Sequence, residues 1–193
     1  MNYLSKKYKI YTRISLYNDI FNNNDKLTSL NIKEIDHLIY KVKKIRKDNN
    51  NLHLSLPPLL TPKEFPKGVN PGCGWAYHVV GILFNGDVTI CGPASGIKEM
   101  VAGNILEKPF YNIWEYSNKF KNLRKYNFRN LKGICGKCPI NDICYGFCRL
   151  DSYLRYGDIC NSFYLCQNYY EAMLNGEINR KAFPSKILEL DRV

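Results

Sequence analysis

In the first part of the chain, hydrophobic residues recur at every second position and then, further along, at every third or fourth position. Tyr, Ile, Thr, Ile and Leu occupy the even positions from residue 8 to residue 16, and this alternation is typical of a β-strand. Between residues 32 and 45 the apolar positions recur every three or four residues, as in an amphipathic helix, and Asn31 with Glu34 fits a capping box at its start. Residues 52–56 have the pattern of another short strand. Together these patterns predict a strand–helix–strand unit with parallel strands.

A single unit of this kind does not complete a domain, because parallel sheets are normally covered on both faces. Residues 1–60 are therefore interpreted as a partial α/β segment, which either packs on the rest of the chain or ends a larger α/β domain. Five prolines and two glycines between residues 57 and 72 indicate a linker. We place the domain boundary near residue 60, with a second domain over residues 61–180 and a tail over residues 181–193.

The second domain begins with a hairpin pattern. Val79–Phe84 and Asp87–Cys91 are strand-like runs, and the Asn85–Gly86 pair between them supplies the two positive-φ residues of a type I′ turn. Gly103–Asn104 predicts another turn. Residues 109–126 predict one helix. Its candidate core residues are Ile113, Trp114, Phe120 and Leu123.

The remaining part of the chain is predicted as irregular beyond Gly133, with short helices around Arg149–Arg155 and Tyr169–Leu174. Strands and helices are thus segregated along the chain rather than strictly alternating. The fold class expected from this order is α+β. It comprises a hairpin with a loop- and helix-rich domain, preceded by a partial βαβ piece.

Composition limits the class of protein. The chain has 193 residues, of which 45% are hydrophobic and 23% charged, as in an ordinary globular protein. It contains no run of 18 apolar residues, so no membrane-spanning helix is predicted and no membrane partner is expected. The N-terminal residues lack the apolar block of a secretory signal. We therefore expect a cytoplasmic protein, in which cysteines stay reduced.

The chain is strongly basic. Its 28 Lys and Arg residues exceed its 17 Asp and Glu residues, which gives a net charge of +11. Such an excess can indicate an anionic partner, such as nucleic acid or an acidic peptide. The basic residues are scattered, apart from a concentration between residues 41 and 47 that fits the solvated face of a helix. We favour the compositional explanation and do not expect nucleic acid as the partner.

Eight cysteines are the main candidates for chemistry. Cys135, Cys138, Cys144 and Cys148 follow each other as C-x2-C-x5-C-x3-C. Reduced cysteines at such spacing point to a metal rather than to disulfides, and soft thiolates select zinc, copper(I) or iron–sulfur clusters. A zinc ribbon normally needs two CxxC pairs or a CxxC pair with histidines, whereas this chain has one CxxC pair. Eight thiolates are enough for two clusters with four ligands each.

The complete cysteine spacing is more specific. Cys73 to Cys91 fits C-x12-G-x4-C, followed by the dense run and, after a gap, by a last cysteine. This spacing resembles the SPASM domain, an auxiliary iron–sulfur module at the C-terminus of many radical S-adenosylmethionine enzymes. Gly103–Asn104–Ile105 with Ile113–Trp114, and the turn at Tyr156–Gly157–Asp158, also resemble stretches of that family. The resemblance covers about residues 70–170, and residues 1–56 resemble the end of the family's partial barrel in pattern only.

The resemblance implies two [4Fe–4S] clusters with interleaved ligands. An inner cluster would be held by Cys73, Cys91 and Cys148, with Cys160 either its fourth ligand or a thiol without a ligand role. Another position that the family uses for that ligand is Lys67 here, which leaves an open iron site as an alternative. The outer cluster would be held by Cys135, Cys138, Cys144 and Cys166.

The catalytic motif of the radical enzymes, CxxxCxxC, does not occur in this sequence. The one CxxxC is Cys144 to Cys148, and residue 151 is Asp151 rather than a cysteine. We therefore expect that this chain alone does not cleave S-adenosylmethionine, which would bind only if a partner chain or domain supplied the missing barrel.

The expected function is that of an auxiliary cluster portion, which serves electron transfer or substrate positioning in peptide or protein modification. Its expected partners are a radical S-adenosylmethionine catalytic chain or domain and a peptide or protein substrate. The alternative is a zinc-stabilised module that binds nucleic acid or protein, motivated by the charge, the CxxC pair and fifteen tyrosines.

Overall fold

The computed structural model describes residues 7–8, 12–15, 29–48, 52–55, 60, 74–126 and 128–178, with the backbone alone for 12–15 and 52–55. The chain divides into two compact units. The first contains residues 1–69 and 165–193, and the second contains residues 70–164. Most of the predicted linker and Cys73 lie outside the described residues, so the predicted boundary near residue 60 stays a prediction.

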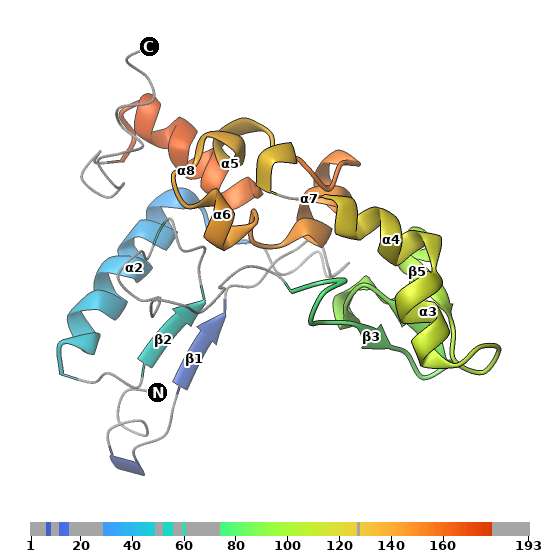
Figure 1. Cartoon of the computed structure of the whole chain (residues 1–193). Coiled ribbons are helices and arrows are strands. Elements are labelled where there is room, and N and C mark those ends of the chain that lie inside the picture. Colours follow the sequence, from blue (N-terminus) through green and yellow to red (C-terminus); the bar gives the residue numbers. More distant parts are fainter. Residues whose placement is uncertain are drawn as a thin grey trace. The chain divides into compact units, whose positions relative to one another are not determined.

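The first unit contains the predicted strand–helix–strand arrangement. Strand β1 (Thr12–Ser15) pairs in parallel with β2 (Leu52–Ser55), and helix α2 (Ile32–Arg46) connects them (Figure 1). Tyr8, which was expected in this strand, is helical, and residues 9–11 and 16 of the predicted run lie outside the described residues. Helix α8 (Tyr164–Leu174), which begins five residues earlier than predicted, supplies Tyr169 to this unit, and the Tyr169 hydroxyl donates a hydrogen bond to Asp36 of α2.

Helix α2 begins with the predicted capping box. The Asn31 side chain accepts a hydrogen bond from the Glu34 N–H at 3.0 Å, and the Glu34 carboxylate accepts one from the Asn31 N–H at 2.8 Å. Ile35, Ile39 and Val42 form its buried face. The box therefore satisfies two N–H groups that the helix cannot pair internally.

Loss of this cap should weaken the first unit. We expect Asn31→Ala to lower the free energy of unfolding by about 1 kcal/mol, the usual cost of removing an N-cap side chain. Chemical denaturation followed by circular dichroism measures the change. Substitution of the exposed Lys33 by Ala is the control, since its side chain takes no part in the box. Equal stabilities for both variants would contradict the prediction.

A three-stranded antiparallel sheet lies at one end of the second unit. Its order is β3 (Gly81–Ile82), β4 (Asp87–Thr89), β5 (Val101–Asn104). The predicted hairpin is present between β3 and β4, with shorter strands. The type I′ turn is wrong, because only Gly86 of the Asn85–Gly86 pair has a positive φ, at 85°. A single left-handed glycine after the turn fits the three-residue loop with a bulge instead.

Gly103 and Asn104 form part of β5, so the turn predicted there is wrong. A Cβ added at Gly103 would lie 3.1 Å from the Ile113 side chain, which packs over this position. The Asn104 amide donates to the Asn85 carbonyl and to the Asp87 carboxylate, both at 3.0 Å. The Gly-Asn pair therefore joins the third strand to the hairpin turn and to the helix above it.

The helix predicted over residues 109–126 is divided in two. Helix α3 (Phe110–Tyr116) ends at Ser117, whose ψ of 134° is extended, and α4 (Asn118–Lys125) follows directly. The Ser117 hydroxyl accepts a hydrogen bond from the Phe120 N–H at 3.1 Å and so caps α4. Both helices lie against β5 (Figure 1). Three of the four candidate core residues are buried, and Trp114 is partly buried.

The cysteine-rich segment contains more helix than expected. Helices α5 (Gly133–Lys137) and α6 (Asn141–Cys144) occupy the part predicted as irregular, and α7 (Arg149–Tyr156) confirms the predicted short helix. Three 3₁₀ turns complete the unit, η3 (Gly92–Ala94), η4 (Lys98–Met100) and η5 (Phe128–Asn130). The core of the unit joins the sheet, α3, α4 and α7, and the partly buried Cys91 and Cys148 pack against it. The mixed content agrees with the α+β class.

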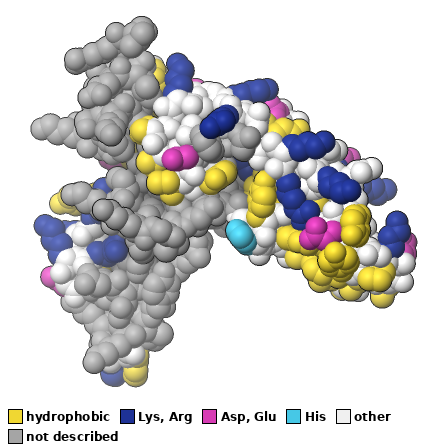
Figure 2. Space-filling model, viewed as in Figure 1, with side chains coloured by type: hydrophobic (Ala, Val, Ile, Leu, Met, Phe, Trp, Pro, Cys, Tyr) yellow, Lys and Arg dark blue, Asp and Glu magenta, His cyan; other side chains and the backbone are white. Residues whose placement is uncertain are grey.

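The surface of the second unit carries charges of both signs on the face shown in Figure 2, where Lys and Arg side chains are spread out with acidic ones among them. Hydrophobic side chains gather at the end that bears β3 and α3, where Phe84 and Leu106 are exposed. This face favours the compositional explanation of the net charge over a single anion-binding patch. Among the helices that the structure describes, none is long and apolar enough to cross a membrane.

Candidate metal centre

Seven of the eight cysteines lie in the described part of the chain, and all seven are free thiols. Five of them are buried, and Cys91 and Cys148 are partly buried. Cys73, predicted as an inner ligand, lies outside the described residues. Buried thiols in such number need a chemical explanation, because packing alone places a few cysteines in a core but does not gather them in one segment.

The first group of thiols consists of Cys135, Cys138 and Cys144, from α5, the turn after it and α6. Burial raises the pKa of Cys138 to about 11 and that of Cys144 to about 12. The charge of Cys135 raises both values further, and that of Cys138 also acts on Cys144. The three sulfur atoms are therefore close enough to influence one another electrostatically.

Backbone N–H groups act on the sulfurs of this group. The Ile140 N–H lowers the pKa of the Cys138 thiol, and the N–H groups of Gly146 and Phe147 lower that of the Cys144 thiol. The Phe163 N–H donates to the Cys135 sulfur at 3.4 Å. Hydrogen bonds of this kind favour the thiolate over the thiol and are one of the means by which proteins tune iron–sulfur clusters.

The loop between Cys144 and Cys148 has an unusual backbone. Tyr145, Gly146 and Phe147 all have positive φ values, of 51°, 75° and 60°. A left-handed conformation costs a non-glycine residue roughly 1–2 kcal/mol, so Tyr145 and Phe147, on either side of Gly146, are maintained against strain. In this conformation the Phe147 N–H donates a hydrogen bond to the Cys144 carbonyl oxygen at 3.1 Å.

The second group is Cys91 with Cys148. Burial raises the pKa of both thiols, and the charge of Cys148 raises that of Cys91 further. The Ala94 N–H faces Cys91, while the N–H groups of Asp151 and Leu150 face Cys148 at the start of α7. Two cysteines 57 positions apart in the sequence, one after β4 and one before α7, are thus brought together by the fold.

Cys160 and Cys166 differ from these groups. Burial raises the pKa of Cys160, and the charges that act on it belong to Asp158, Arg149 and Lys132 rather than to any described cysteine. Its N–H donates to the Asp158 carboxylate at 2.8 Å. Cys166 is buried in α8, in the first unit. The ligand roles of both residues stay predictions.

Two residues, Ser162 and Arg149, lie at the site without having been recognised in the sequence. The Ser162 hydroxyl accepts a hydrogen bond from the Cys135 N–H at 3.1 Å and donates one to the Lys132 carbonyl at 2.8 Å. Arg149 is 3% exposed, although it carries a full charge. The one signal that the sequence offered for Arg149 was its position directly after Cys148.

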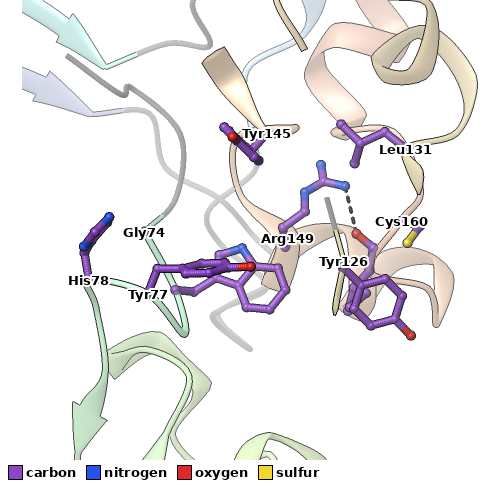
Figure 3. A pocket seen from close by; sticks show the side chains of 10 residues that line it. Gly74, Tyr77, His78, Tyr126, Leu131, Tyr145, Arg149 and Cys160 are labelled. Atoms are coloured by element: carbon purple, nitrogen blue, oxygen red, sulfur yellow. Dashed lines mark hydrogen bonds between the residues drawn. The ribbon is translucent and has the colours of Figure 1, made fainter. Parts of the chain in front are cut away.

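A cavity of about 310 Å³ lies beside Arg149 and Cys160. Aromatic side chains from distant parts of the sequence line it, including Trp75, Tyr77, Tyr126 and Tyr145 (Figure 3). The Tyr77 hydroxyl donates to the Arg124 carbonyl at 2.5 Å, and the Arg124 Nε–H donates to the Ala76 carbonyl at 2.8 Å. These hydrogen bonds connect the turn that contains Ala76 and Tyr77 to the end of α4.

The donor set fits an iron–sulfur cluster. Its sulfurs are buried and free of disulfides, and the Cys135 sulfur accepts a hydrogen bond from the Phe163 N–H, as is common around such clusters. Within the described residues, no three His, Cys, Asp or Glu side chains converge tightly enough to hold one metal ion. A cluster distributes its thiolates over several irons, so it can use sulfurs that are more widely separated.

Comparison with known proteins agrees with this donor set. Residues 73–139 match the family model of SPASM, an iron–sulfur cluster-binding domain. The chain is 43% identical over 63 residues to an AdoMet-dependent heme synthase of Methanosarcina barkeri. The aligned residues make up 33% of this chain and 17% of that protein. This chain is 27% identical over 109 residues to a PqqA peptide cyclase of Xanthomonas campestris, covering 56% and 28% of the two chains. The chain thus spans less than a third of the length of either relative.

Proposed function

We propose that this chain, whose residues 73–139 match the SPASM iron–sulfur cluster-binding domain, binds two auxiliary [4Fe–4S] clusters within a radical S-adenosylmethionine system. The observation that carries the proposal is the separation of the thiols into two groups, Cys135 with Cys138 and Cys144, and Cys91 with Cys148, within which the thiols influence one another electrostatically. Two groups of thiols suit two clusters better than one.

The proposed ligand sets follow these groups. Cys135, Cys138 and Cys144 hold one cluster, with Cys166 as the fourth ligand. Cys91 and Cys148 hold the other cluster together with Cys73, and its fourth position is either Cys160 or an open iron site. The electrostatic influence of Cys148 on Cys91 supports their assignment to the same cluster. Cys160 is influenced by none of the described cysteines, which favours the open iron site.

When bound, such clusters supply one-electron transfer, and an open iron can take a ligand. The residues of this chain bind and shield them. Burial excludes water from the sulfurs, and the N–H groups of Gly146 and Phe147 lower the pKa of the Cys144 thiol. The strained loop before Cys148 holds these two residues in place before any metal arrives, so that less ordering is needed on binding.

The proposed role is electron transfer or substrate positioning in the modification of a peptide or protein. The match to PqqA peptide cyclases supports a peptide substrate, and the aromatic cavity beside Cys160 offers a site large enough for a side chain. S-adenosylmethionine would be bound and cleaved by a catalytic domain or chain that carries the CxxxCxxC motif. The alternative, a zinc-stabilised binding module, has the buried thiols in its favour but needs four ligands around one ion.

Anaerobic reconstitution tests the proposal directly. Incubation of the chain with ferrous iron and sulfide should give a brown protein that contains about eight irons per chain, as expected for two [4Fe–4S] clusters. Iron, acid-labile sulfide and zinc are measured after desalting, and the reduced protein is examined by electron paramagnetic resonance. A colourless protein with one equivalent of zinc would support the alternative function.

A further inference from the structure

Arg149 is a buried cation in the cysteine-rich segment. It directly follows Cys148 and is the first residue of α7, and only 3% of its surface is exposed. The guanidinium of arginine stays charged at any ordinary pH. A charge in this position must be compensated, because transferring it from water into a protein interior costs several kcal/mol or more.

The guanidinium is held by neutral groups. Nη1 donates to the carbonyl oxygens of Ile159 at 2.8 Å and Asn161 at 2.6 Å, and Nη2 donates to that of Gly146. Figure 3 shows the first of these bonds. The Nε–H is buried without a hydrogen-bond partner. Carbonyl oxygens satisfy N–H groups, but they do not neutralise a full charge.

The nearby carboxylates are already paired with other cations. Asp151 accepts a hydrogen bond from Arg155 at 3.0 Å, and Asp158 forms an ion pair with Lys132 at 2.6 Å. The charge of Arg149 lowers the pKa of Asp158, but as a smaller cause than the Lys132 hydrogen bond. In the part of the chain that the structure describes, Arg149 forms no ion pair of its own.

The anion that Arg149 lacks can be supplied by a cluster. The Arg149 guanidinium is bonded to the carbonyls of Ile159 and Asn161, which flank Cys160, and to that of Gly146, which lies between Cys144 and Cys148. The cation therefore lies among the proposed ligand cysteines. A cluster bound through thiolates carries a net negative charge, and this charge increases when an electron is added. A buried cation nearby therefore stabilises the reduced state more than the oxidised state, since little water screens it.

We propose that Arg149 is the buried counter-cation of the cluster held through Cys148 and that it raises the reduction potential of this cluster. The inference rests on the proposed function. Its physical basis is the solitary buried charge, the unpartnered Nε–H and the position beside a ligand cysteine. The carbonyl bonds orient the guanidinium, which makes Arg149 a positioning and tuning residue rather than a catalytic one.

Two variants distinguish the effect of the charge from that of the side chain's hydrogen bonds: Arg149→Gln removes the positive charge, and Arg149→Lys keeps it. In the reconstituted chain, potentiometric titration followed by electron paramagnetic resonance measures each cluster, and the loss of a signal in Cys91→Ala identifies the cluster in question. For Arg149→Gln we expect the ratio of reduced to oxidised cluster at a fixed potential to fall at least tenfold, which corresponds to about 59 mV for one electron. Arg149→Lys keeps the charge and should stay within that limit.

Lys125→Gln is the matched control, because it removes the same charge from an exposed position of the second unit. It should leave both potentials unchanged. Wild-type iron content with an unshifted potential in Arg149→Gln would overturn the inference. If Arg149→Gln does not bind iron, Arg149→Lys still tests the inference. A tenfold change in its ratio of reduced to oxidised cluster, in spite of the retained charge, would show that the hydrogen bonds of Arg149 matter and its charge does not, and would overturn the inference. Failure of the wild-type chain to bind iron would instead contradict the proposed function.

Discussion

Cys144→Ala should reduce the iron content of the reconstituted chain by about half, from about eight irons to about four. Cys144 is the most strongly perturbed of the thiols with a quantified pKa, about 12, because it is buried beside two other cysteines. The N–H groups of Gly146 and Phe147 lower this pKa, but burial outweighs them, so a bound metal is needed to keep the Cys144 sulfur anionic. Removal of the sulfur should therefore abolish one cluster.

Cys160→Ala is the matched control for this change. Cys160 is buried to the same extent, with 7% of its surface exposed as for Cys144, but its thiol is influenced by none of the described cysteines. It should retain about eight irons per chain. Iron and sulfide analysis and the resonance spectra of the reduced proteins distinguish the variants. Retention of both clusters in Cys144→Ala, or loss of one in Cys160→Ala, would require a different ligand assignment.

Cluster loss should also lower stability. Metal binding contributes folding free energy wherever the binding site is absent from the unfolded chain, and the segment around Cys144 consists of helices of four and five residues. Such short helices are not stable alone. The thermal midpoint of reconstituted Cys144→Ala should therefore lie below that of Cys160→Ala, whereas the two metal-free proteins should differ little.

Local patterns in the sequence predicted the elements whose signals are local. The capping box and the apolar face of α2 were sufficient to place that helix, and Asn85–Gly86 placed the hairpin. Strand β5 was missed because Gly103 and Asn104 favour turns, whereas here the glycine makes room for Ile113. The break at Ser117 was missed because a serine within a helical pattern is a weak signal on its own.

The thiol chemistry of the candidate site was expected from the cysteines, whereas the backbone around it was not. The family resemblance had already grouped Cys91 with Cys148, and the electrostatic influence of Cys148 on Cys91 agrees with this grouping, while the ligand roles stay predictions. The left-handed conformations of Tyr145 and Phe147 could not be predicted, because neither residue type favours them. The burial of Arg149 was equally hidden, since arginine is normally a surface residue.

Gly81→Ala should selectively impair the other thiol group. A Cβ at Gly81 would lie 2.7 Å from the carbonyl carbon and oxygen of Cys91 and 2.6 Å from the Thr89 hydroxyl oxygen. A Cβ atom does not come this close to backbone atoms without strain. The Thr89 hydroxyl cannot easily move aside, because it donates a hydrogen bond to the Cys91 carbonyl oxygen at 2.8 Å. The backbone of Cys91 must therefore move, at a cost of roughly 1–3 kcal/mol for overpacking.

The expected result is loss of the cluster held through Cys91 and Cys148, with the cluster of Cys135, Cys138 and Cys144 retained. Gly92→Ala is the control, because Gly92 adjoins Cys91 but a Cβ there would meet no atom within 4 Å. It should load iron as the wild type does. Iron analysis gives the number of clusters, and comparison with the spectrum of Cys144→Ala shows which one remains. If Gly81→Ala and Cys144→Ala lost the same signal, Cys91 and Cys144 would serve one cluster, and the division of the thiols into two groups would be wrong.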